Sequence, residues 1–132
     1  MPMPLELLIE RWFAIGFLVF GLSHLLYPGK WAAVFLPLRE SDTGGLLVAT
    51  FTLPLGLMVV LAHNIWVWGL PVIVTLIGWA MIAKSLFYLF IPRALRLMMR
   101  DCQRTQRAFS VAGVAMILLG ALLVYDSFYK RL

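Results

Sequence analysis

The chain has 132 residues, of which 63% are hydrophobic and 13% are charged, and its formal net charge is +5. Soluble domains are about 45–50% apolar and about 25% charged, and a water-soluble domain this small could not bury so many apolar side chains. The composition excludes a disordered, collagen-like or disulfide-stapled chain and predicts a membrane protein. Cys102 is the single cysteine, so the chain cannot form an internal disulfide.

Four segments are long and apolar enough for spanning helices of roughly 20 residues: about 5–27, 44–62, 65–91 and 108–128. Backbone hydrogen bonds must be satisfied within lipid, so we expect an all-α fold, an integral membrane four-helix bundle. The predicted connections are a polar loop over residues 28–43, a tight turn at 62–64 and a basic segment over 92–107. Pro54 and Pro71 fall inside predicted spans, where we expect them to kink the helices.

The basic residues predict an orientation. The loops after the first and third spans hold seven Lys and Arg residues, and the opposite side holds three. Basic residues concentrate in cytoplasmic loops, so we expect both termini outside a bacterial inner (plasma) membrane, on its periplasmic face.

Glycine and proline landmarks recur in the two halves of the chain. The first half holds Ile15-Gly16, Pro28 and Gly56, and similar landmarks follow 62 to 64 residues later, at Ile77-Gly78, Pro92 and Gly120. This recurrence predicts two tandem helical hairpins, residues 1–64 and 65–132, in the same orientation within one compact domain.

The first span ends in Leu-Leu-Tyr-Pro-x-x-Trp, at residues 25–31, and a basic stretch and a glycine-bearing span follow. This pattern resembles the two-helix bacterial inner-membrane proteins of the YjeT-like family, and the second half follows it as well. The resemblance implies two fused units and a membrane location, without an assigned activity. The family has an acidic residue about eight positions before the proline, where this chain has Phe20 and Lys84, so no polar residue is carried over. The four-helix DoxX-like membrane proteins are the second resemblance.

Arginines recur at spacings of 3, 4, 4 and 3 residues in the basic segment: Arg93, Arg96, Arg100, Arg104 and Arg107. At about 100° per residue they share one face, which predicts a basic amphipathic helix on the inner membrane surface between the third and fourth spans. Each arginine contributes about 1 kcal/mol of attraction to anionic phospholipid headgroups. The alternative is a docking stripe for an acidic protein partner. We expect no nucleic-acid partner.

Polar side chains inside a span are candidates for function. Lys84 and Ser85 lie in the third predicted span, with Trp79 at its middle, and His24 lies near the inner end of the first. Lys84 either extends its amine to the inner headgroups or lines a polar path that binds an anionic substrate.

The two histidines lie near opposite faces of the predicted bundle, so one metal ion or haem could not bind both, and we expect no metal site and no cofactor. We expect His24 to be a hydrogen-bonded interhelical residue and His63 to be an exposed cap in the turn at 62–64. Asp126, near the outer end of the fourth span, is expected to be hydrated.

Small residues recur at helical spacing on two spans: Gly45, Ala49, Thr52 and Gly56 on the second, and Ala108, Ala112, Met116 and Gly120 on the fourth. They predict close-packing seams that either complete the bundle or form a homodimer.

The sequence has no metal-ligand spacing, phosphate loop or nucleophile triad of a known enzyme class, so catalysis is not expected. It favours a non-catalytic accessory or scaffold subunit of a membrane complex, which needs apolar seams and a docking surface. The alternative is a small oligomeric transporter or channel with a polar site near Lys84 and Ser85.

Overall fold

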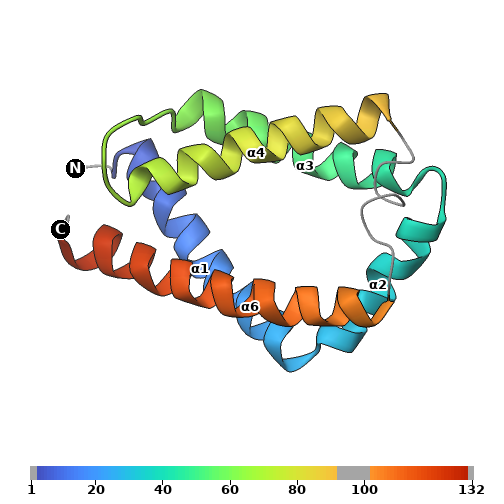
Figure 1. The fold of residues 1–132 in the computed structure, drawn as a ribbon. Coiled ribbons are helices and arrows are strands. Elements are labelled where there is room, and N and C mark those ends of the chain that lie inside the picture. The colour runs from blue at the N-terminus through green and yellow to red at the C-terminus, as the bar shows by residue number, and fades with distance from the viewer. Residues whose placement is uncertain (1–2, 92–101, 131–132) are drawn as a thin grey trace.

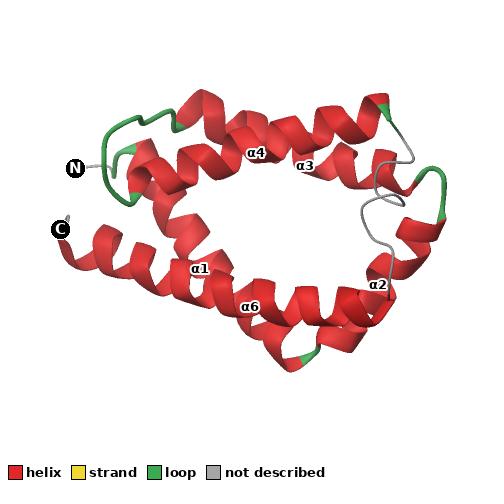
Figure 2. Ribbon diagram, in the orientation of Figure 1, coloured by secondary structure: helices red, strands yellow, loops and turns green. Residues whose placement is uncertain are grey.

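The computed structural model describes residues 3–91 and 102–130, and for residues 102–105 it describes the backbone alone. The regular structure in these ranges is helical (Figure 1; Figure 2). The elements are α1 (Leu5–Leu26), α2 (Pro28–Glu40), α3 (Gly44–Ala62), α4 (Pro71–Phe90), α6 (Cys102–Val124) and a final π-helical segment, η1 (Tyr125–Lys130). The predicted all-α fold is therefore confirmed.

Three helical stretches of the described chain are long and apolar enough to cross a membrane: Gly44–Ala62, Pro71–Phe90 and Gln106–Lys130. The predicted second span has the same bounds as α3. The first predicted span, α1, carries Glu6, Glu10 and Arg11 in its first two turns and is not one of the three.

The third predicted span begins later than the hydropathy suggested. Residues 63–70 connect α3 to α4 without a regular helix, and Gly69 takes a φ of 147° that other residues rarely adopt. Pro71 is the first residue of α4, where its missing N–H is no loss. The predicted kink at Pro71 is therefore wrong, whereas Pro54 does lie inside α3.

The polar loop predicted for residues 28–43 is wrong, because most of it forms helix α2. Tyr27 breaks the helix at the end of α1, and Pro28 begins α2 with a backbone angle suited to a first helical turn. One face of α2 packs against α6, where the ring centroids of Phe35 and Phe109 lie 5.4 Å apart.

The long helices pair as α1 with α6 and α3 with α4 (Figure 1). We expected α1 and α3 to pack along their lengths as the first hairpin, but these two helices make contact only near one end. The structure thus contains two packed helix pairs, which we call the outer pair (α1 and α6) and the middle pair (α3 and α4) after their places in the chain. The four-helix bundle in its expected hairpin form is not seen.

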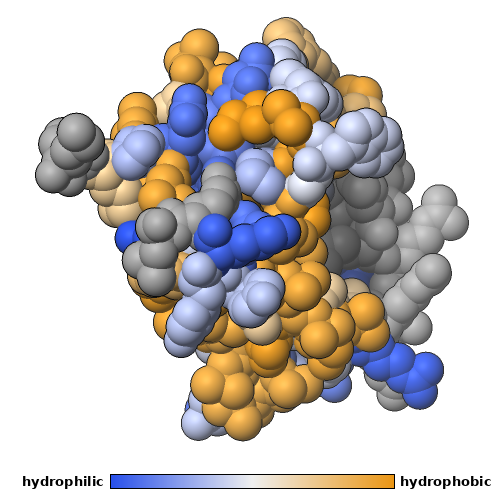
Figure 3. Space-filling model, turned by 90° about the vertical axis from the view of Figure 1, so that its left-hand side faces the viewer, coloured by the Kyte–Doolittle hydropathy of each residue, from blue (hydrophilic) through white to orange (hydrophobic). Residues whose placement is uncertain are grey.

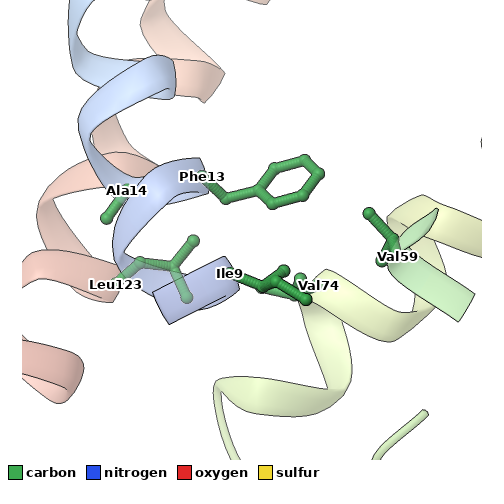
Figure 4. Packing of buried hydrophobic residues seen from close by; sticks show 6 residues of the cluster. All are labelled: Ile9, Phe13, Ala14, Val59, Val74 and Leu123. Carbon is green, nitrogen blue, oxygen red and sulfur yellow. The ribbon is translucent and has the colours of Figure 1, made fainter. Parts of the chain in front are cut away.

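The two pairs meet at both ends of the molecule. Near the chain termini, Ile9 and Phe13 of α1 approach Val59 of α3 and Val74 of α4 in a buried apolar cluster (Figure 4). At the other end, α2 joins the pairs: Leu38 of α2 packs against the buried cluster of Ala49 and Tyr88, which belong to α3 and α4.

Small residues let the helices of each pair approach closely, as the spacing predicted. In the middle pair, the predicted seam of α3 is confirmed, since Gly45, Ala49 and Gly56 are buried. In the outer pair, the predicted seam of α6 is confirmed at Gly120, while Gly113, which was not predicted, also lies in it. Gly113 and Gly120 are buried against α1, whereas Ala108 is exposed.

Candidate polar site between the helix pairs

Three fully buried polar side chains join the outer pair to the middle pair: Glu10 of α1, His63 at the end of α3 and Thr75 of α4. Glu10 Oε1 lies 2.9 Å from Nε2 of His63, and Nδ1 of His63 lies 3.1 Å from the Thr75 hydroxyl oxygen. One imidazole ring therefore bridges three helices within hydrogen-bond distance.

The Thr75 hydroxyl has further partners that fix its role. Its oxygen accepts the main-chain N–H of Ile65 at 3.0 Å, and its proton points to the main-chain carbonyl of His63 at 3.2 Å. Because the hydroxyl proton is donated to the His63 carbonyl, the hydroxyl oxygen accepts a hydrogen bond from Nδ1–H of the imidazole. A proton then lies between Nε2 of His63 and the Glu10 carboxyl group, bound to one or the other.

Burial is the largest influence on His63, and it lowers the pKa of the imidazole from its usual value because a charged ring loses its hydration. The hydrogen bond of His63 with the backbone and the negative charge of Glu6 act in the opposite direction and are smaller. Burial therefore favours the uncharged form of the ring.

The order of hydroxyl, imidazole and carboxylate is that of a nucleophilic triad, but this arrangement does not offer a nucleophile. Thr75 is fully buried, and its oxygen already accepts the N–H of Ile65. A substrate carbonyl has no access to it. The three side chains instead hold the ends of helices together.

A second polar group lies at the same end of the molecule. The guanidinium of Arg11 donates two hydrogen bonds to the main-chain carbonyl of Ser127, at 3.2 and 2.9 Å, and it also lies 4.3 Å from the centroid of the Phe128 ring. Asp126 and Ser127 are buried in η1. Seen from this end, hydrophilic residues gather among apolar ones (Figure 3).

Two predictions for this end are wrong. His63 is not an exposed cap, because the connection after it runs over residues 63–70 and lets the ring pack against α1 and α4. Asp126 is not hydrated, because α6 continues as η1 alongside α1 and covers the carboxyl group.

The structure separates the polar residues predicted within the third span. Ser85 is buried in the seam between α3 and α4, where its hydroxyl oxygen lies 2.6 Å from that of Thr52. Lys84 is exposed, with its amine 5.7 Å from the Tyr88 ring. The two residues therefore face different surroundings.

Trp79 lies nearer the start of its helix than predicted, because α4 begins at Pro71. Its indole N–H points to the side-chain oxygen of Asn64 at 3.4 Å, and that oxygen also accepts the indole N–H of Trp66 at 2.7 Å. Trp79 thus belongs to the connection between α3 and α4 and does not lie alone at mid-span.

His24 lies between helices, as predicted, but its hydrogen bond is within its own helix. Nδ1 lies 2.7 Å from the main-chain oxygen of Phe20, and the ring stacks on Trp31 of α2 with centroids 4.4 Å apart. Trp31 in turn donates to the Ser23 hydroxyl at 2.9 Å. His24 and His63 share no ligand site, and no group of three or more metal-binding side chains occurs in the described ranges.

Most of the arginine stripe lies outside the described residues: Arg93, Arg96 and Arg100. Arg104 belongs to the first turn of α6, which begins before the predicted fourth span, and Arg107 is exposed on the same helix. The last two arginines therefore lie on α6 itself.

No protein-family model, curated protein or solved structure matches this chain. Sequence reasoning missed Glu10 and Thr75. Glu10 had a usable signal, since it is a carboxylate in an apolar helix at the end of the molecule predicted to hold His63.

Proposed function

We propose that this protein is an integral membrane protein of four crossings, α1, α3, α4 and α6, that serves as a non-catalytic accessory subunit of a membrane complex. The apolar composition and the three long apolar helices support the membrane location. Both termini lie at one end of the molecule, as an even number of crossings requires (Figure 1). The basic loops support an inner-membrane orientation with those termini outside, and the arginine stripe is then available to anionic headgroups.

The observation that carries the accessory role is an apolar groove of about 410 Å³ on α1. Two ridges of large side chains on α1 line the groove, and Met116 of α6 lines it as well. One ridge is formed by Trp12, Ile15 and Val19, and the other by Phe13, Phe17 and Phe20. Gly16 lies between the ridges, and a Cβ atom added there would meet nothing within 4 Å. A glycine floor between two ridges is the shape that accepts a ridge of another helix in a membrane.

A second observation supports an origin by fusion of two units. Positions 64 residues apart occupy equivalent places in the two helix pairs: Ala14 and Gly78, Gly21 and Ser85, Ala49 and Gly113, and Gly56 and Gly120. A Cβ at Gly120 would lie 3.0 Å from the main-chain oxygen of Ala14, and one at Gly56 would lie 3.0 Å from that of Gly78.

The polar contacts follow the same relation. Arg11 donates to the carbonyl of Ser127, and Thr75, 64 residues after Arg11, donates to the carbonyl of His63, 64 residues before Ser127. These contacts support an offset of 64 residues between α1 and α4 and between α3 and α6. This offset aligns Gly78 with Ala14, whereas the sequence landmarks aligned it with Gly16.

The repeat supplies a matched control for the groove. Ala80 stands 64 residues after Gly16 and is exposed, whereas Gly16 is half-buried. We expect Gly16→Leu to fill the groove and release the partner helix, and Ala80→Leu to retain it, as measured by native mass spectrometry of the complex purified in mild detergent. Both variants should keep the wild-type helix content. If Gly16→Leu purifies with the same bound subunits as the wild type, the groove does not hold the partner.

A further inference from the structure

Lys84 is an exposed cation on α4, one of the helices that are long and apolar enough to cross a membrane. A charged side chain in such a helix is costly unless it reaches water or an ion of opposite charge. No carboxylate of the described chain forms an ion pair with its amine. Phe20 stands 64 residues earlier, at the equivalent place in the outer pair, so a helix pair packs without a cation there. Lys84 is therefore available to an anion from outside the chain.

The side chain of Lys84 extends toward the end of α4 that is predicted to be cytoplasmic. Its amine lies 5.7 Å from the centroid of the Tyr88 ring, which is one turn nearer that end. The helix ends at Phe90, six residues after Lys84, which is about 9 Å along the helix axis. The four-carbon stem of lysine covers part of that distance. The amine therefore lies near the level of the lipid phosphates and away from the centre of the bilayer.

Lys84 lies on the side of α4 that faces the outer pair. Ile77, two helical turns earlier and so on the same side, packs against the buried cluster that contains Ile9 and Phe13 of α1. Between that cluster and the contact of α2 with Tyr88, the two pairs lie apart, and Lys84 is exposed there (Figure 1). Its exposed neighbours on α4 are apolar: Ala80, Ala83 and Phe87. An amine among apolar side chains suits a ligand that carries both a phosphate and acyl chains.

We propose that Lys84 binds the phosphate of an anionic phospholipid of the inner leaflet, whose acyl chains extend along α4 between the two helix pairs. The proposal rests on the membrane location in the proposed function and is independent of the groove on α1. The ammonium group donates charge-assisted hydrogen bonds to the phosphate oxygens.

The surroundings of Lys84 favour a phospholipid over a free phosphate ion. A free ion would exchange its hydration for apolar neighbours, and a single amine compensates only part of that cost. A phospholipid already presents its phosphate at this depth, and its chains contact the apolar side chains. A zwitterionic headgroup carries its own cation beside the phosphate, so the charge of Lys84 favours a lipid with a net negative charge.

Native mass spectrometry of the full chain in mild detergent tests the site by counting the lipids that each variant retains. The probes are phosphatidylglycerol and phosphatidylcholine with the same acyl chains. We expect Lys84→Met to bind phosphatidylglycerol about tenfold more weakly than the wild type, because one charge-assisted contact is lost. Lys84→Arg should keep the site, because the guanidinium group retains the charge. Phosphatidylcholine should bind equally to all three proteins.

Lys30 supplies a matched control, because it is an exposed lysine of α2 whose amine lies 5.0 Å from the centroid of the Tyr27 ring. Lys30→Met removes the same charge and should leave the bound phosphatidylglycerol in place. An equal loss in Lys30→Met and Lys84→Met would show general attraction to headgroups and overturn the proposal. Displacement of the lipid by inorganic phosphate would assign the site to a free ion and contradict it as well.

A labelling experiment on the wild type decides the matter if Lys84→Met loses the wild-type helix content. Phosphatidylglycerol should slow the reaction of Lys84 with an amine-reactive ester and leave that of Lys30 unchanged, whereas equal rates with and without the lipid would refute the site. The groove on α1 is tested separately, since Gly16→Leu should keep the bound lipid. A wild type that fractionates with the membrane but does not prefer phosphatidylglycerol would refute the lipid site alone.

Discussion

Substitution of Gly21 by alanine tests the α1–α6 seam against a control in the same helix. A Cβ atom at Gly21 would lie 2.9 Å from the main-chain oxygen of Gly113 and 2.9 Å from Cγ1 of Ile117. The oxygen belongs to the backbone of α6, so the two helices must move apart to accept the methyl group. At Gly16, in the same helix, the added methyl group would meet nothing within 4 Å.

The expected free energies of unfolding follow from two opposing effects. Both substitutions improve helix propensity by about 1 kcal/mol. Overpacking at Gly21 costs about 1–3 kcal/mol, because close contact with backbone atoms is lost along the seam. We therefore expect Gly16→Ala to be up to about 1 kcal/mol more stable than the wild type. Gly21→Ala should be about 1–3 kcal/mol less stable than Gly16→Ala.

The assay is reversible unfolding of the purified protein in one detergent, with helix content followed by circular dichroism as the mole fraction of dodecyl sulfate rises. Gly113→Ala, on the facing helix, should lose stability as Gly21→Ala does, because its Cβ would lie 2.8 Å from the main-chain oxygen of Gly21. If Gly21→Ala is as stable as Gly16→Ala, the α1–α6 seam is not packed as described.

Three further predictions address the middle pair, the arginine stripe and the repeat. Thr52→Val removes the 2.6 Å contact with Ser85 and should lower the free energy of unfolding by about 0.5–1 kcal/mol in the same assay; an unchanged value would show that the contact adds no stability. Reversal of three arginines to glutamate, at Arg96, Arg100 and Arg104, should release an acidic partner in a detergent pull-down without loss of membrane insertion. Retention of the partner would show that the stripe acts only through attraction to lipid headgroups. The two halves, expressed as separate chains split after residue 64, should assemble and copurify, since each helix pair needs a helix from each half; two halves that purify alone would contradict the pairing.

Helix locations were largely predictable from the sequence, because apolar length determines where a helix can span a membrane. The bounds of α3 agree with the prediction at both ends. Helix α2 was missed because its sequence is only moderately apolar and begins with proline, which we took as the start of a loop. Proline at a first helical position and proline after a helix look alike in a sequence, and here Pro28 is both.

The partner of each helix was not predictable from small-residue spacing. Gly21 and Ala14 in α1 are seven residues apart, as are Gly113 and Gly120 in α6 and Ala49 and Gly56 in α3. Equal spacing allows α1 to pack against either helix. The contacts at the ends of the helices decide between them, and these depend on the path of the connections.

The polar site was half visible in the sequence. Predicted topology put His63 and the start of α1 at the same outer end, so a contact with Glu10 was within reach of that reasoning. The depth of His63 was not, because it depends on the eight-residue connection over residues 63–70, which hydropathy had merged with the third span. A charged side chain in the first turns of an apolar helix can be either hydrated or buried, and the path of the neighbouring backbone determines which.

The pairing of α1 with α6 has a consequence for the order in which the chain assembles. Helix α1 leaves the ribosome before the other described helices and its partner α6 is made after α3 and α4, so Ala14 and Gly21 lack their packing partner until α6 has been synthesised. The middle pair has no such delay, because α3 and α4 follow each other directly. His63 also emerges before α6 and gives Glu10 an early neighbour. The helices of the middle pair are therefore both available for packing before the outer pair can form.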